Sequence, residues 1–197
     1  MKNSTRLLTF TALFIALILL FGSTPFGLIP LGFVNVTILA IPVVIGTIVL
    51  GLGPGLILGF CFGLISMLSM FGMTMTAPSA LASALAAANP GLAILMCFAP
   101  RLMVPVVTYL TFKALAGPNG HRKAALPVAA VAGSLTNTIL YLGLMLLFYT
   151  MVGLDSTKLR AIIAGVGLIA GGSEAAVNAI LTTPIVMALW AIERKHE

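Results

Sequence analysis

One arginine interrupts an otherwise apolar stretch of the chain, LMCFAPRLMVPVV at residues 95–107. Arg101 stands there between Pro100 and Pro105, and these prolines would disturb the backbone hydrogen bonding of a helix and leave carbonyl groups free beside it. A planar guanidinium donates paired hydrogen bonds to a carboxylate. The chemistry that Arg101 indicates is therefore recognition of a negatively charged group on a ligand.

Polar side chains also occur at helical spacing in two other apolar runs. Glu174 and Asn178 are four residues apart, as are Asn137 and Tyr141, so each pair shares one face of a helix. Glu174 is either the partner of Arg101 in an ion pair or an acceptor for ligand hydroxyl groups. That ion pair would fix helix register, or hold the arginine until a ligand arrives. The two asparagines and Tyr141 are candidate ligand contacts, with hydrogen bonds between helices as the alternative role of the asparagines.

The residue combinations needed for catalysis are missing. His121 and His196 fall in a connector and in the tail, so no histidine is available at membrane depth as a base or a zinc ligand. Neither a G-x-S-x-G frame nor a Walker-type phosphate loop occurs. Cys61 and Cys97 lie in apolar runs without a CxxC pair and are expected to be small buried hydrophobes. We predict that the chain is not an enzyme and needs no cofactor.

The solvent around these residues must be lipid. The chain has 197 residues, of which 60% are hydrophobic and 7% are charged, whereas soluble domains carry about 25% charged residues. The net charge of +6 comes from residues at the ends of apolar runs. It forms no basic stripe with interleaved aromatics, so nucleic-acid binding is not expected. We predict a single integral membrane domain, residues 1–197, that crosses a cell membrane several times.

Apolar runs of spanning or nearly spanning length predict the architecture. They cover residues 7–22, 37–50, 55–71, 90–115, 124–151 and 160–192. The expected fold is an all-α membrane protein, a six-transmembrane-helix bundle with both termini on one side. Most basic residues fall on that side, which makes it cytoplasmic by the positive-inside rule. They are Lys2, Arg6, Lys113, Arg122, Lys123, Arg194 and Lys195.

The connectors on the opposite side, residues 23–37 and 72–89, are long and not very polar, so we expect them to pack over the outer mouth of the bundle. The second is too weakly apolar to be predicted as a span. Asn35 in the first connector and Phe71 just before the second are included among the predicted ligand contacts. Aromatic rings are scarce here, which disfavours a flat heteroaromatic ligand.

Small residues at two places indicate close helix packing. Ala12 and Ala16 are four residues apart on one face of the first run, a spacing that lets another helix approach. Gly171 and Gly172 precede Glu174 and permit close approach of a neighbouring helix in the same way.

Together these segments resemble the substrate-binding S-component of energy-coupling factor (ECF) vitamin transporters. The resemblance is carried by VNVTILAIPVVIGTIVLGLGPGLILGFCFGLISM (34–67), APRLMVPVVTYL (99–110), AGSLTNTILYLGLMLLFY (132–149) and EAAVNAILTTPIV (174–186). The segment ALFIA in the first run is similar to the AxxxA motif of the family. The resemblance implies a bundle in the bacterial plasma membrane that captures a vitamin from outside. It also implies a membrane-embedded coupling subunit that contacts Ala12 and Ala16, and two cytoplasmic ATPase subunits.

Within this family the chain is most similar to the pantothenate-specific branch. That similarity implies that Arg101 holds the ligand carboxylate and that Asn137 contacts the ligand, with Glu174 and Asn178 as further contacts. The absence of a ring from pantothenate agrees with the few aromatic residues. Two alternatives remain open. One is an S-component for another vitamin or precursor, such as pyridoxine or a pyrimidine, riboflavin or cobalamin. The other is a structural membrane protein whose polar residues only lock helices together.

Overall fold

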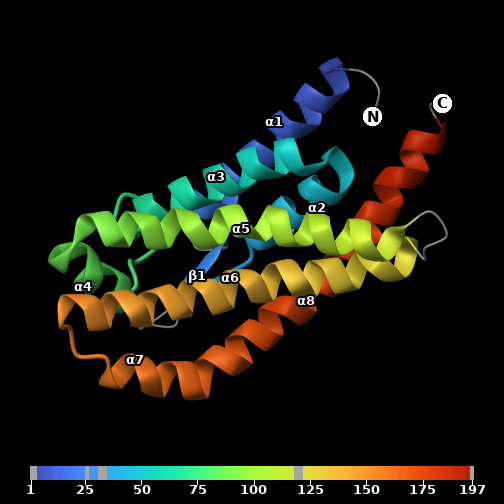
Figure 1. The fold of residues 1–197 in the computed structure, drawn as a ribbon. Helices are drawn as coiled ribbons and strands as arrows, with labels where there is room; N and C mark the ends of the chain where they lie inside the picture. Colours follow the sequence, from blue (N-terminus) through green and yellow to red (C-terminus); the bar gives the residue numbers. More distant parts are fainter. Residues whose placement is uncertain (1–3, 25–26, 31–34, 118–121, 196–197) are drawn as a thin grey trace.

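The computed structural model describes residues 4–24, 27–30, 35–117 and 122–195 of the chain, which is almost entirely helical (Figure 1). The helices are α1 (Ser4–Ser23), α2 (Ala40–Leu50), α3 (Leu52–Met70), α4 (Ala80–Ala88), α5 (Pro90–Ala116), α6 (Arg122–Val152), α7 (Thr157–Ile162), a π-helical turn η1 (Ile163–Gly167) and α8 (Leu168–Lys195). Two short strands, β1 (Leu28–Pro30) and β2 (Asn35–Thr37), pair antiparallel. The predicted all-α membrane class is confirmed.

The predicted apolar runs correspond to α1, α2, α3, α5, α6 and the continuous α7–η1–α8 segment. Within the described ranges, five helices are long and apolar enough to cross a membrane: α1, α3, α5, α6 and the Ala170–Ile192 part of α8. The remaining run, residues 37–50, forms α2, which has only 11 residues and is about 16 Å long at about 1.5 Å per residue. That length is about half of a hydrocarbon core of roughly 30 Å.

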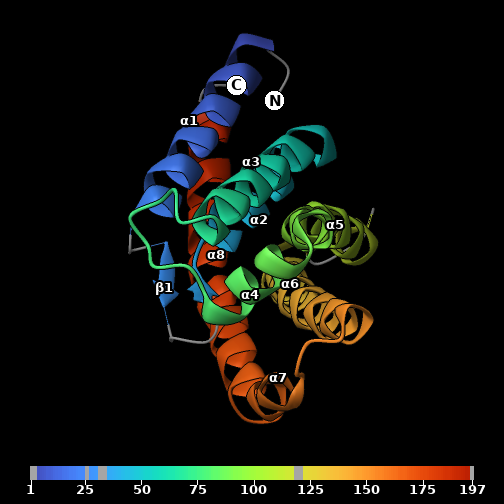
Figure 2. The same cartoon turned by 90° about the vertical axis from the view of Figure 1, so that its left-hand side faces the viewer.

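The two ends of the bundle differ in what they carry. Figure 1 places the start of α1, the end of α8, the α2–α3 turn, the end of α5 and the start of α6 at one end, which we call the terminal end. The opposite end, called the loop end, carries α4 and the α6–α7 connection, with the β1–β2 hairpin in the same half of the molecule. Figure 2, in which the loop end faces the viewer, shows α4 and the connector before it lying in front of the long helices.

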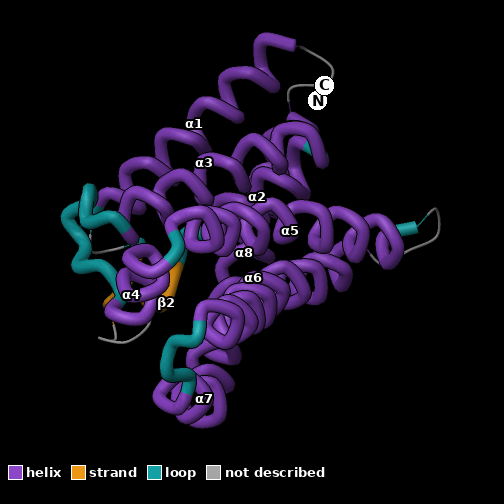
Figure 3. The backbone as a smooth tube through the Cα atoms, turned by 60° about the vertical axis from the view of Figure 1, so that its left-hand side comes forward, coloured by secondary structure: helices purple, strands orange, loops and turns teal. Residues whose placement is uncertain are grey.

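Helix α4 forms within the second long connector, and capping side chains mark its start and the start of α5. The side chain of Ser79 accepts a hydrogen bond from the backbone N–H of Ala82, and the side chain of Asn89 accepts one from Leu92 at the start of α5. Pro90 then occupies the first turn of α5, where its missing N–H costs nothing. The hydroxyl of Tyr149 on α6 donates to the carbonyl of Leu81 at 2.5 Å and ties α4 to the bundle. The tube in Figure 3 shows α4 at the loop end of the bundle.

Glycine lets α8 approach α6 closely at one of the two predicted positions. A Cβ placed on Gly171 would lie 2.8 Å from the side-chain methyl of Thr138 on α6. A Cβ on Gly172 would meet nothing within 4 Å, and Gly172 is exposed. The expectation of close packing is therefore confirmed for Gly171 and wrong for Gly172, because only the first faces the neighbouring helix.

This difference supplies a matched pair of substitutions. Gly171→Leu is expected to destabilise the protein by about 1–3 kcal/mol, because the added side chain must push α8 away from Thr138. Gly172→Leu adds the same side chain on the exposed face and should leave stability unchanged or slightly improved, since leucine is the better helix former. Thermal unfolding of the purified variants in one detergent measures both. Equal melting temperatures for the two variants would contradict this packing.

Candidate functional site

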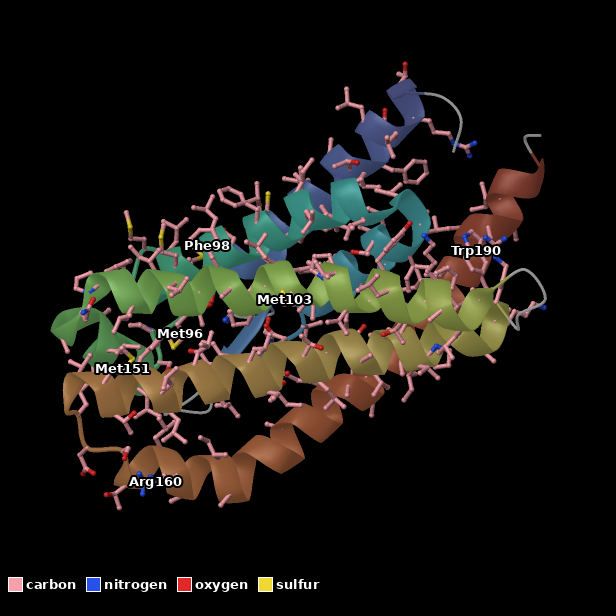
Figure 4. The ribbon with its side chains drawn as sticks, in the orientation of Figure 1. Met96, Phe98, Met103, Met151, Arg160 and Trp190 are labelled. Atoms are coloured by element: carbon pink, nitrogen blue, oxygen red, sulfur yellow. The ribbon has the colours of Figure 1, made fainter. Side chains whose placement is uncertain are left out.

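Arg101 is buried in α5, with 5% of its surface exposed. Pro100 has no N–H, so it cannot donate to the carbonyl of Met96 four residues earlier. One terminal nitrogen of the Arg101 guanidinium takes that place and donates to the Met96 oxygen at 3.1 Å. The free carbonyl expected beside the prolines is therefore present, and it anchors the arginine. Figure 4 labels Met96 on α5.

The second proline of α5 has a similar effect on the other side of Arg101. Pro105 cannot donate to the carbonyl of Arg101, and helix α3 comes close to that oxygen at Gly59. A Cβ on Gly59 would lie 2.6 Å from the Arg101 oxygen and 3.2 Å from the Pro105 ring. Only glycine fits there without moving one of the two helices. The backbone around Arg101 is thus held between α3 and its own prolines.

Two aromatic rings flank the guanidinium. Its central carbon lies 4.5 Å from the ring centroid of Tyr141 on α6 and 5.3 Å from that of Phe62 on α3. A ring face attracts the cation without neutralising it. The Nε atom of Arg101 is buried without a hydrogen-bond partner among the described residues. Tyr141 was a predicted site residue. Phe62 was missed because nothing in the sequence relates α3 to Arg101.

Glu174 does not pair with Arg101 in this structure, so the first of its two predicted roles, the ion pair, is not observed. One carboxylate oxygen accepts the backbone N–H of Thr37 at 2.6 Å, and the other accepts the hydroxyl of Thr138 at 3.2 Å. Glu174 thus joins α8 to the end of strand β2 and to α6. These two hydrogen-bond donors offset part of the cost of a carboxylate inside the bundle. Sequence reasoning missed Thr37, whose only signal was its position at the end of the first long connector.

The two predicted asparagines are buried, with 5% of Asn137 and 1% of Asn178 exposed. The hydroxyl of Thr182, one turn further along α8, donates to Oδ1 of Asn178 at 2.8 Å. The Nδ2 donor of Asn178 has no hydrogen-bond partner among the described residues, and neither has the Oδ1 acceptor of Asn137. Buried polar groups of this kind are rare and costly unless a partner binds them.

The remaining predicted ligand contacts lie elsewhere or are not described. Phe71 follows α3 and is 46% exposed. It is nine residues beyond Phe62, or about 13 Å further along the chain direction of α3. It lines a hollow of about 350 Å³ between the end of α3 and α4 that does not include Arg101. Asn35 begins strand β2, but its side chain lies outside the described part of the structure.

The predicted partner-interface residues lie on the outer surface of the bundle. Ala12 and Ala16 are exposed on α1, whereas Phe14 and Ile18 on the opposite side of the same helix are buried in the core. Leu8 on the outer face is 72% exposed. The small residues therefore form a shallow strip on a face of α1 that packs against no other part of the described chain.

Comparison with known proteins shows the family of the chain. Residues 6–186 match the family model described as "ECF transporter, substrate-specific component". The chain is also 34% identical over 163 residues to the "Pantothenic acid transporter PanT" of Lactococcus lactis subsp. cremoris (strain MG1363), and the match covers 79% of this chain and 78% of that protein. The family match includes every predicted site residue. The chain therefore belongs to the family of ECF transporter substrate-specific components and is a multi-pass membrane protein.

Proposed function

We propose that this chain is the pantothenate-binding subunit of an ECF importer and that Arg101 holds the carboxylate of the vitamin. The observation that carries the proposal is that this guanidinium is buried and has no carboxylate partner among the described residues. It is buried, it donates to one backbone carbonyl, and it lies between two rings rather than beside a carboxylate. The similarity of the chain to a pantothenic acid transporter supports pantothenate as the anion. A guanidinium has five N–H donors, so most of its binding capacity remains for a ligand.

The asparagines match the remaining groups of pantothenate. Because Thr182 occupies Oδ1 of Asn178, the free atom of this side chain is a donor, which suits an amide carbonyl. The free atom of Asn137 is an acceptor, which suits an amide N–H or a hydroxyl. Pantothenate offers a carboxylate, an amide and hydroxyl groups in a flexible chain. Glu174 can accept a further ligand hydroxyl because a carboxylate has about four acceptor positions.

The proposal includes the rest of the transporter. The terminal end would face the cytoplasm, since most basic residues lie in its connectors and tails. The loop end would then face outside, so the hairpin and α4 would border the entry path. The exposed strip of Ala12 and Ala16 would meet the membrane-embedded coupling subunit. Two cytoplasmic ATPase subunits would supply the energy.

Calorimetry on the purified wild-type protein tests the proposed ligand. The panel consists of pantothenate, its uncharged alcohol pantothenol, pyridoxine, riboflavin and cobalamin. Pantothenate should bind tightest. Pantothenol should bind at least about 30-fold more weakly, because Arg101 would lose its charged partner in a buried site. Tighter binding of another vitamin would reassign the substrate, and binding of none would overturn pantothenate as the ligand.

A further inference from the structure

A second polar site lies at the terminal end of the bundle, away from Arg101. A hollow of about 500 Å³ opens there between α2, α5 and α6. Its lining combines two cations with aromatic and apolar side chains. The lining residues are Ile48, Tyr109, Phe112, Lys113, Ala116, Gly117 and Arg122. Its size falls within the range of about 300–1,000 Å³ that is typical of small-molecule sites.

Aromatic rings hold both cations in place. The Lys113 ammonium lies 5.8 Å from the ring centroid of Tyr109, and the Arg122 guanidinium lies 5.5 Å from that of Trp190 on α8. Phe112 and Trp190 contact each other with centroids 6.1 Å apart. These contacts orient the two charges but leave them uncompensated.

The surrounding charge is positive. Among the described side chains, neither Lys113 nor Arg122 pairs with a carboxylate. The sequence places Glu193 and Glu197 at the same end, and their side chains lie outside the described part of the structure. They are outnumbered by the basic residues of the terminal end, which are Lys2, Arg6, Lys113, Arg122, Lys123, Arg194 and Lys195. The hollow is therefore suited to an anion.

The hollow lies at the depth of lipid headgroups. Helix α5 has 27 residues and α6 has 31. They are about 40 Å and 46 Å long at about 1.5 Å per residue, longer than a hydrocarbon core of roughly 30 Å. Their ends at Lys113 and Arg122 consequently reach the polar layer, and Trp190 is a residue type typical of that interface. Figure 4 shows Trp190 near the terminal end and Arg160 at the opposite end.

We propose that this hollow binds the headgroup of an anionic phospholipid. Lys113 and Arg122 contact the phosphate, and Ile48 and Phe112 contact the start of an acyl chain. A phospholipid would contact both the cationic and the apolar part of the lining, whereas a soluble anion would leave the apolar part unoccupied. The lipid would wedge between α2 and the α5–α6 pair, and the pantothenate site would not be touched.

Native mass spectrometry and lipid titration in nanodiscs test the proposal. The double variant Lys113→Gln/Arg122→Gln should bind phosphatidylglycerol roughly 30-fold more weakly than wild type, from about 1 kcal/mol per basic residue near a membrane surface. Arg160→Gln is the matched control, because Arg160 is an exposed arginine at the loop end. It should bind the lipid as wild type does. Pantothenate binding should be unchanged in both variants.

Titrations with other ligands distinguish a phospholipid headgroup from a soluble phosphate. Phosphatidylcholine, soluble glycerol 3-phosphate and inorganic phosphate should each bind far more weakly than phosphatidylglycerol. Equal binding of a soluble phosphate would overturn the lipid assignment, and so would equal binding of phosphatidylcholine. If the double variant keeps phosphatidylglycerol but loses assembly with the coupling subunit, the hollow is a protein contact and the proposal is wrong.

Discussion

Arg101→Ala is expected to weaken pantothenate binding by about 2–5 kcal/mol, or roughly 30-fold to a few thousand-fold, and to change pantothenol binding little. The large effect follows from the burial of the guanidinium. An ion pair formed there is shielded from water, so its loss leaves the ligand carboxylate unpaired inside the bundle. The two ligands differ only at the group that Arg101 would hold. Calorimetry with both ligands on wild type and variant gives a double-mutant cycle, which measures the coupling free energy between Arg101 and the ligand carboxylate.

Two further variants separate charge recognition from damage to the fold. Arg101→Lys keeps the cation but not the planar fork, so its affinity for pantothenate should fall between those of wild type and Arg101→Ala. Arg160→Ala removes an exposed arginine at the loop end and should leave binding intact. Melting temperatures of all variants establish that each is folded. Equal loss of pantothenate and pantothenol affinity in Arg101→Ala would show that Arg101 does not recognise the carboxylate.

The second large effect is expected on transport. Ala12→Leu combined with Ala16→Leu should reduce pantothenate uptake by cells to near background and prevent co-purification with the coupling subunit. The reason is steric, since two leucines on the exposed strip of α1 would keep another helix from approaching closely. Pantothenate affinity of the isolated variant should stay at the wild-type value, because neither alanine contacts the Arg101 region. Uptake of labelled pantothenate and pull-down of the complex are the measurements.

Ala188→Leu provides the matched control for this variant. Ala188 is an exposed alanine on α8, so the substitution adds the same side chain to another outer surface of the bundle. Uptake and complex formation should persist in this variant. If the α1 double variant transports and assembles normally, the strip is an ordinary lipid-facing surface. If the α1 variant loses pantothenate affinity as well, its defect lies in the fold.

The helices themselves were predictable from composition. A chain in lipid must satisfy its backbone hydrogen bonds within each segment, so an apolar run becomes a helix whatever its neighbours are. The run predicted over 90–115 is α5, Pro90–Ala116. The free carbonyl beside Arg101 was predictable for a similar reason, because it depends only on Pro100 and the residue four positions earlier; that Arg101 binds it was shown by the structure.

The pairing of side chains across helices was not predictable in the same way. Glu174 binds the backbone of Thr37, 137 residues earlier, instead of the arginine that charge alone suggested. Gly171 meets Thr138, whereas Gly172 next to it meets nothing. Phe62 joined the site without any signal in the sequence.

The sequence by itself thus determined which apolar runs form helices, which residues carry charge within those runs and which backbone groups the prolines release, whereas helix α4 in the second connector was not predicted. Those features depend on hydrophobicity and on hydrogen bonds within a few residues of one chain segment. The tertiary structure alone decided which carboxylate, ring or amide faces Arg101. That outcome depends on the rotation of each helix about its axis and on how the connectors set one helix against another. A change of one residue in the facing position, or about 100° of rotation, replaces the whole set of contacts.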